Sequence, residues 1–287
     1  MIVFGTISTS SHLYKCFALA NSVFPFGGIL KILLIDQPKP NQRNNLPPNC
    51  ELVMLDTLQS DVALKLANKY KKDKLRWSLK PVFLLYLLTS FQKAIYVDND
   101  IFFFSDYNGL EKELDNNNIL LTPHYYPSSP KKKQTWLEAN LRIGLFNAGF
   151  VGANRNAKEA LEWWSECCLY EMKKSYSRGL FDDQKYLDLM PILFDKVKIL
   201  KNKVSNVAGW NDYIQLPEKE VIFVHFNSFT LNKFKEETHK YVNLCAKYKE
   251  EVRTFNPNFE FKSTRLNSFE VQNALYFIKW RIVRLFN

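Results

Sequence analysis

Short apolar runs alternate with amphipathic segments along the first hundred residues. Four runs rich in Ile, Leu and Val predict strands, at residues 2–7, 29–35, 52–55 and 94–97. Residues 13–23 and 79–88 predict helices between them, and the second helix begins through Pro81, which a first turn tolerates. Strands that alternate with helices indicate an α/β fold with a Rossmann-like, mostly parallel sheet flanked by helices. In such sheets, ligands bind beyond the carboxyl ends of the strands.

The second half of the chain is less regular. Residues 123–133 hold three prolines and three consecutive lysines and predict an exposed loop. Residues 156–174 place apolar side chains at helical spacing, and residues 221–226 predict another strand. The composition changes near Leu231, so we expect a catalytic-type domain at 1–230 and a helical, basic and aromatic extension at 231–287.

Composition narrows the class of protein. Hydrophobic residues make up 46% of the 287 positions, which excludes collagen-like, low-complexity and disordered chains. The net charge of +10 favours anionic partners, and 11 of the 39 basic residues lie in the last 57 positions. Five cysteines without a CxxC pair argue against a disulfide framework or a structural zinc site.

The chain start and the cysteine usage predict a cytoplasmic protein. The first residues, MIVFGTISTSS, have no basic region and no cleavable signal pattern. An odd number of unpaired cysteines is typical of a reducing compartment. The longest apolar run, at 81–88, is too short to span a bilayer.

The most informative motif is Asp98-Asn99-Asp100, which follows an apolar strand and precedes another apolar run. Two carboxylates at the end of a buried strand are costly unless their charge is neutralised. A divalent cation would do so, because Mg²⁺ and Mn²⁺ take oxygen ligands and share their shell with substrate phosphates. The simpler alternative is a pair of solvated carboxylates or a helix cap.

Three further motifs indicate a function only when they are taken together. Asn147-Ala148-Gly149 would allow close approach of a ligand to the backbone, or form a simple turn. Asp183-Gln184 suits recognition of sugar hydroxyl groups, or a solvated helix start. His225 follows a strand and could ligate a metal, or make a structural hydrogen bond.

In this order, with Trp210-Asn211 before the late histidine, the motifs resemble the GT-A nucleotide-sugar glycosyltransferases. The similarity is greatest to glycosyltransferase family 8 and to related bacterial enzymes of surface polysaccharide assembly. Segments that carry it include LKP, IYVDNDIFFFSD, LTPH, FNAGF and GLFDDQKYLDLMP. The resemblance covers residues 1–230 and implies a GT-A catalytic domain.

The resemblance implies roles for the residues of these motifs. Asp98, Asp100 and His225 would bind Mn²⁺ or Mg²⁺ together with the donor diphosphate. Asn147 would contact the donor sugar, as would Asp183 and Gln184, the candidate catalytic residues near the anomeric carbon. The resemblance thus implies that four of these residues contact the nucleotide-sugar donor: Asp98, Asn147, Asp183 and Gln184.

The same resemblance implies the nucleotide contacts and the substrates. Thr6 and Ser8, at the end of the first strand, would cradle the nucleotide, and Lys80 or Arg76 would face the diphosphate. The resemblance also implies a UDP-sugar donor and retention of anomeric configuration. The implied acceptor is a glycan or glycolipid in bacterial surface polysaccharide (lipopolysaccharide or capsule) synthesis.

The sequence departs from the family 8 pattern after His225. Family 8 continues into a Gly and a Lys-Pro-Trp segment, whereas this chain reads Phe-Asn-Ser-Phe-Thr. The lysine of that segment is missing, and Lys233 or Lys235 is the candidate substitute for its phosphate contact.

Two rival functions fit parts of the sequence. A phosphatase of the haloacid dehalogenase type also places DxD after a strand, but its motif has Thr or Val where this chain has Phe102. A nucleic-acid-binding protein would explain the positive charge, but no zinc finger, RNP motif or evident helix-turn-helix occurs. We therefore expect no nucleic-acid partner.

The end of the chain allows two interpretations. Residues 269–287 interleave aromatic and basic side chains: Tyr276, Phe277, Lys279, Trp280, Arg281, Arg284 and Phe286. Such a segment would lie on an anionic leaflet, at the inner face of the cytoplasmic membrane, and suit a lipid-linked acceptor. The other interpretation is a helix packed on the catalytic domain with its basic residues outward.

Overall fold

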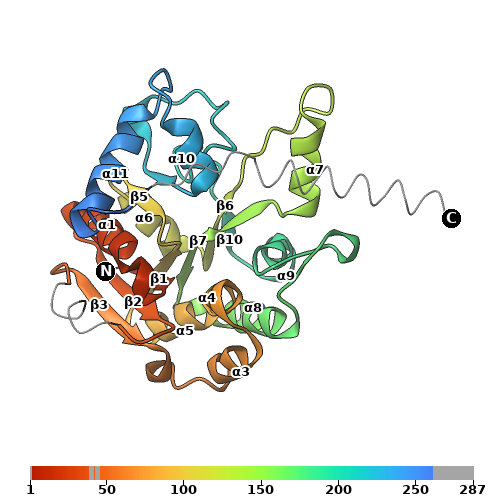
Figure 1. Cartoon of the computed structure of the whole chain (residues 1–287). Coiled ribbons are helices and arrows are strands. Elements are labelled where there is room, and N and C mark those ends of the chain that lie inside the picture. The colour runs from red at the N-terminus through yellow and green to blue at the C-terminus, as the bar shows by residue number, and fades with distance from the viewer. Residues whose placement is uncertain (1, 39–41, 43–45, 261–287) are drawn as a thin grey trace.

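A seven-stranded sheet runs through the molecule (Figure 1). The structure, a computed structural model, describes residues 2–38, 42 and 46–260. The strands are, in spatial order, β10 (Val197–Ile199), β6 (Ile119–Pro123), β7 (Phe146–Asn154), β4 (Lys93–Val97), β1 (Ile2–Ser8), β2 (Ile29–Leu34) and β3 (Cys50–Met54). The two pairs that β7 forms with β4 and β6 are antiparallel, and the other four pairs are parallel. The predicted fold class is thereby confirmed.

Helices cover both faces of this sheet. They are α1 (Leu13–Val23), α3 (Asp61–Lys69), α4 (Lys72–Ser78), α5 (Lys80–Ser90), α6 (Asn108–Asn116), α7 (Gln134–Arg142), α8 (Lys158–Tyr170), α9 (Met190–Leu193), α10 (Ser228–Phe234) and α11 (Val242–Phe255). Along β1, Val3 and Ile7 enter the core beneath α5 and α8, while Ile2 and Phe4 enter the core beneath α1 and α6. Because both faces are covered, β1 is apolar on both sides and buried along its whole length.

Two small ribbons complete the fold and bear on the site. β5 (Ile101–Phe103) pairs antiparallel with β11 (Phe223–His225), in a register that sets His225 opposite Ile101. β8 (Lys174–Ser175) pairs antiparallel with β9 (Leu180–Phe181), directly before residues 182–184.

The predicted elements are mostly present, with three corrections. The helix expected at 156–174 ends at Tyr170, because the chain turns there into β8, which contains Lys174. The Asn147-Ala148-Gly149 segment is not a simple turn but part of β7, buried at all nine positions between β4 and β6. The exposed loop expected at 123–133 is confirmed only in part: α7 begins at Gln134, but Pro123 still belongs to β6, and His124 and Tyr126 are buried against the cavity.

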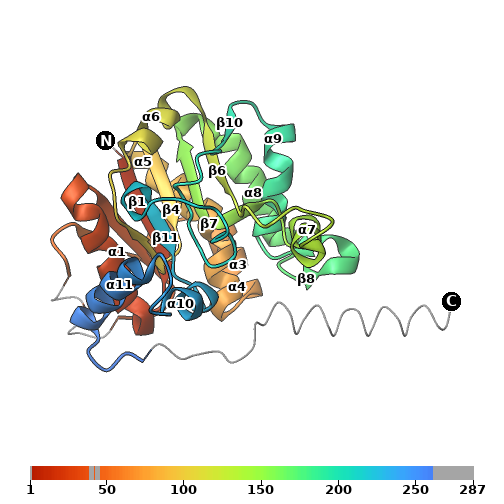
Figure 2. The same ribbon diagram turned by 90° about the horizontal axis from the view of Figure 1, so that it is seen from above.

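The described part of the C-terminal extension is helical. α11 lies along α1 (Figure 2), and Tyr248 of α11 stacks on Phe226, with ring centroids 4.3 Å apart. α10 runs across residue 230, and the domain boundary proposed there stays a prediction. The aromatic and basic segment 269–287 lies outside the described residues. Among the helices that are described, none combines the length and apolar character that crossing a bilayer requires.

Candidate active site

Two carboxylates and an imidazole meet at the carboxyl end of β4. The chain turns tightly after β4, where the Ile101 amide donates to the Asp98 carbonyl (3.0 Å), and the Phe226 amide donates to the Asp100 carbonyl (2.7 Å). This ties β11 to the DxD turn. Asp98, Asp100 and His225 consequently offer three ligand atoms that all lie within 4.8 Å of one another. We call these three residues the metal corner.

The metal corner fits a divalent cation. Carboxylate oxygens and an imidazole nitrogen form a donor set that suits Mn²⁺ or Mg²⁺. Gly149 of β7 keeps the space beside them open, because a Cβ there would lie 2.7 Å from His225 Cε1 and 2.9 Å from Asp98 Oδ2. The sequence prediction placed these three side chains together, and the structure does the same; their role as metal ligands stays a prediction.

The charges within the metal corner are strongly coupled. Nε2 of His225 lies 3.0 Å from Oδ1 of Asp100. Burial alone would raise the pKa of Asp100, but the charge of His225 and its hydrogen bond outweigh burial and hold that pKa well below its usual range. Burial would lower the pKa of His225, and Asp100 instead raises it. The carboxylate is therefore ionised and ready to bind a cation at neutral pH.

Lys80, the first residue of α5, links the metal corner to Asp183. Its buried ammonium lies 3.0 Å from Asp183 Oδ2 and 3.4 Å from Asp98 Oδ1, and it donates to the Ala148 carbonyl (3.0 Å). Burial would lower the pKa of Lys80, but the two carboxylates raise it above its ordinary value. Burial raises the pKa of Asp183 to about 6 despite the partly offsetting charge of Lys80. At pH 7 both partners are charged.

Asn147 and Gln184 are held by specific hydrogen bonds. Nδ2 of Asn147 lies 2.9 Å from Nδ1 of His225 and 2.8 Å from Oδ1 of Asn206, so this amide orients the imidazole. Nε2 of Gln184 donates one of its two hydrogens to the Ile143 carbonyl (3.2 Å), and the Gln184 side chain also hydrogen-bonds His124. The donor-sugar contacts expected of Asn147, Asp183 and Gln184 stay predictions, and all three side chains line one cavity.

His124, which also lines the cavity, is a neutral histidine. Its Nδ1 lies 3.1 Å from the carbonyl oxygen of Gly144. Gly144 has a φ of +126°, which favours glycine. His124 is fully enclosed, and burial lowers its pKa to about 3, so its imidazole is neutral at physiological pH.

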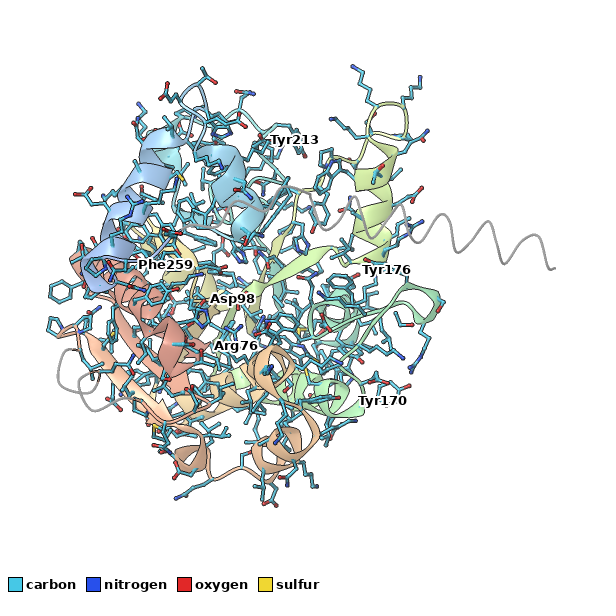
Figure 3. All side chains as sticks on the ribbon, viewed as in Figure 1. Arg76, Asp98, Tyr170, Tyr176, Tyr213 and Phe259 are labelled. Carbon is cyan, nitrogen blue, oxygen red and sulfur yellow. The ribbon has the colours of Figure 1, made fainter. Side chains whose placement is uncertain are left out.

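The remaining predicted contacts are less direct. Thr6 is buried within β1 and does not line the cavity, while the Ser8 hydroxyl accepts from Asn99 (3.1 Å) and so supports the DxD turn. Arg76 pairs with Asp73 and lies with Asp98 near the centre of the view in Figure 3. Lys233 pairs with Asp212 (2.7 Å). The roles predicted for these residues and for Lys235 stay predictions.

A cavity of about 330 Å³ opens above Lys80, Asp98 and Asp183. Seven Phe, Tyr and Trp side chains line it, and we call four of them, which pack in one cluster, the aromatic wall: Tyr126, Trp136, Trp210 and Phe229. The sequence did not predict the wall, apart from Trp210, or Asn206, and it pointed to His124 only as the last residue of the LTPH segment. No short motif joins these residues, so only the fold brings them together.

Comparison with known proteins places the chain in a family. No family model matches it. The uncharacterised protein YfnD of Bacillus subtilis (strain 168) is 31% identical over 269 residues, which cover 86% of this chain and 82% of YfnD. The chain belongs to the YfnD family. The B. subtilis protein YfnF is 29% identical to this YfnD-family chain over 216 residues, covering 72% of the chain and 71% of YfnF.

Solved glycosyltransferase structures share the fold of this YfnD-family chain. The bifunctional glycosyltransferase WbbM matches 88% of the chain with a TM-score of 0.56 and 15% identity. The galactosyltransferase LgtC, in complex with donor and acceptor sugar analogues, matches 88% of the chain and 96% of its own length, with a TM-score of 0.54 and 12% identity. GlyE of Streptococcus pneumoniae TIGR4 matches 88% with a TM-score of 0.54 and 13% identity.

The chain spans about half the length of WbbM (49%) and 62% of GlyE. These likenesses establish the GT-A fold that the sequence predicts. Membership in family 8 stays a prediction. Neither the phosphatase nor the nucleic-acid-binding alternative is favoured by them.

Proposed function

We propose that this YfnD-family protein is a metal-dependent glycosyltransferase that moves a sugar from a nucleotide-diphosphate donor, a UDP-sugar, to a carbohydrate acceptor. The observation on which this depends most is the metal corner, which a GT-A sheet places beside the Lys80–Asp183 pair. Ligands of α/β sheets bind at this carboxyl edge of the strands.

The metal corner would act on the leaving group. Asp98, Asp100 and His225 would hold Mn²⁺ or Mg²⁺, which when bound supplies a Lewis acid for the negative charge of the departing diphosphate. Asn147 fixes the orientation of His225, and Tyr96 donates to Oδ1 of Asp98 (2.8 Å), so two of the three ligands are held in place in advance. Such preorganisation means that few groups must move when the donor binds.

Asp183 and Gln184 would act on the donor sugar. As the bond between the anomeric carbon and the diphosphate oxygen breaks, positive charge develops on the sugar. The side chains of Asp183 and Gln184 both line the cavity, and their oxygen atoms would stabilise that charge. Lys80 keeps Asp183 ionised and in place. The acceptor hydroxyl oxygen would then bond to the anomeric carbon on the face that the diphosphate leaves, and its proton would pass to the leaving phosphate, with retention of configuration.

The biological setting is also part of the proposal. We infer a glycan or lipid-linked glycan acceptor in surface polysaccharide (lipopolysaccharide or capsule) assembly and a cytoplasmic location. Peripheral contact with the inner face of the membrane would involve residues 269–287. The resemblance of the sequence motifs supports the acceptor class, and the net charge of +10 supports contact with an anionic surface.

The test is release of nucleoside diphosphate from a panel of UDP- and GDP-sugars, in the presence of Mn²⁺ and then of EDTA. We expect slow, metal-dependent release from at least one UDP-sugar even without acceptor, because water can take the acceptor's place. Asp100→Asn should lower its rate on the order of 10²-fold, whereas Asp195→Asn, at an exposed carboxylate outside the cavity, should not. No release from any donor by folded protein would contradict the proposal.

A further inference from the structure

The cavity is lined by two chemically different sets of side chains. One set is charged and includes Lys80, Asp98 and Asp183. The other set is aromatic and includes the aromatic wall, whose rings form a connected cluster. Tyr126 lies 5.2 Å from Trp136 and 6.3 Å from Trp210, and Trp136 lies 6.2 Å from Phe229, all between ring centroids. His124 stacks on Tyr126 at 4.6 Å and an interplanar angle of 8°.

The fold separates the wall from the region expected to hold the nucleotide. Tyr126 follows β6, and Trp136 lies on α7, the helix before β7. In the sheet, β7 and β6 lie on one side of β4, whereas β1, whose end is the predicted nucleotide cradle, lies on the other. Because Asp98 ends β4, it lies between the two regions. A donor with its nucleotide over β1 and its diphosphate at Asp98 therefore leaves the part of the wall formed by Tyr126 and Trp136 open to an acceptor.

We propose that the aromatic wall binds a pyranose ring of the acceptor and thereby selects the acceptor; this proposal rests on the proposed function. A pyranose presents apolar C–H faces and a rim of hydroxyl groups. The half-buried rings of Trp136 and Phe229 offer the complementary apolar surface, and the polar atoms of Tyr and Trp offer hydrogen bonds at their edges. The volume of about 330 Å³ lies at the small end of ligand cavities, so it takes a short saccharide.

A buried donor in the wall supports a polar ligand. Nε1 of Trp210 is buried and has no hydrogen-bond partner among the described residues. A buried N–H without a partner costs about 1–3 kcal/mol, so buried polar groups are rarely left this way. The Trp210 side chain lines the cavity, and a sugar hydroxyl oxygen would accept from it after a small adjustment of the ring. A purely apolar ligand would leave this cost in place.

The experiment measures saturation transfer by NMR from the full-length protein to methyl glycosides of glucose, galactose, mannose and N-acetylglucosamine, and to UMP. We expect the ring C–H protons of at least one methyl pyranoside to receive saturation. Trp136→Ala should reduce this signal about fivefold to tenfold, the size of one aromatic contact. Trp136→Phe, which keeps a ring, should retain most of it.

A matched control separates the wall from general damage. Trp163, which is also half-buried but packs on Phe194 outside the cavity, should be replaceable by Ala without loss of saturation transfer. If Trp136→Ala fails to fold, Phe229→Ala provides the same test from α10. Calorimetric titration of UDP with Mn²⁺ on the same samples reports the donor site separately.

Three results would overturn the proposal. They are a lack of saturation transfer to any of the pyranosides, an unchanged signal in folded Trp136→Ala, and loss of the UMP signal rather than a pyranoside signal in that variant. The last would mean that the wall stacks the nucleobase, since aromatic side chains also stack bases. Pyranoside binding by a protein that does not bind UDP would instead overturn the proposed function and leave the wall as a sugar site.

Discussion

The metal corner and the aromatic wall border one cavity but are built in different ways. The corner is fixed by main-chain hydrogen bonds: the Asp98 amide donates to the Gly149 carbonyl (2.8 Å), and the register of β11 against β5 places His225. The wall is held mainly by contacts between rings from separate segments. Strand register leaves little freedom, whereas ring packing allows graded adjustment.

The difference between the metal corner and the aromatic wall shows how catalysis and acceptor selectivity can reside in separate residues of one cavity. Groups that must stabilise charge need fixed positions, because a small displacement weakens electrostatic catalysis. Groups that select an acceptor tolerate substitution, because each ring contact contributes a small, separate amount to the free energy of binding. Substitutions in the corner should therefore abolish turnover or stability, and those in the wall should alter only acceptor binding.

The largest effect should come from Lys80→Met, which removes the cation that neutralises Asp98 and Asp183. Leaving one side of a buried ion pair uncompensated costs about 3–5 kcal/mol. We expect a loss of that size in the free energy of unfolding, measured with urea. The double variant Lys80→Met/Asp183→Asn should recover part of it. A single variant as stable as the wild type would show that the pair does not support the corner.

Asp100→Asn should come next, because it keeps the shape of the side chain but removes a charge that faces His225. Turnover of the donor should fall on the order of 10²-fold, as when one electrostatic element of an active site is lost. The melting temperature should also fall, because the buried His225 loses its ionic partner, so turnover is compared at a temperature at which circular dichroism shows the variant to be folded. Activity within a few-fold of the wild type would contradict the assignment of Asp100 as a metal ligand.

Gly149→Ala tests whether open space in the corner matters. The new methyl group would lie 2.7 Å from His225 Cε1 and 2.9 Å from Asp98 Oδ2 and would displace both ligands. We expect UDP binding in Mn²⁺ to weaken about tenfold, which corresponds to roughly 1.4 kcal/mol. Gly109→Ala, in α6, is the matched control, because a Cβ there meets nothing within 4 Å. Equal affinities of the two variants would contradict the prediction.

The smallest effect concerns pH and the wall side of the cavity. His124 has its pKa lowered to about 3 by burial, so between pH 6.5 and 3 the unfolded chain binds a proton there that the folded chain does not. Stability therefore falls as the pH drops through this range, by at most about 1.4 kcal/mol per pH unit from this group. His124→Asn should show a shallower slope in urea unfolding at pH 7, 6 and 5. Parallel slopes would mean that His124 is not neutral in the fold.

The two regions also differ in how far the sequence predicts them. Asp98 and Asp100 follow an apolar strand, and His225 follows another, so local pattern and motif order place them at one sheet edge. The Asn147–Gly149 segment lacks the residues typical of strands, and only its position between β4 and β6 makes it one.

The other contacts depend on the tertiary fold. Lys80 meets Asp183 across more than a hundred residues, and Tyr126 and Phe229 of the wall are equally distant in sequence. No periodicity or short motif encodes such pairs, because each depends on how separate segments pack. The charged residues of the metal corner could therefore be predicted from the sequence. The neutralisation of their charge by Lys80 and the aromatic wall could not.

The most direct test of the central claim is calorimetric titration of UDP into the full-length protein with Mn²⁺ and with EDTA, repeated on Asp100→Asn. The account predicts saturable binding that requires Mn²⁺ and is lost in the folded variant, because Asp98, Asp100 and His225 would hold the cation that binds the diphosphate. Equal UDP binding in Mn²⁺ and EDTA, or no binding by folded wild-type protein, would contradict it.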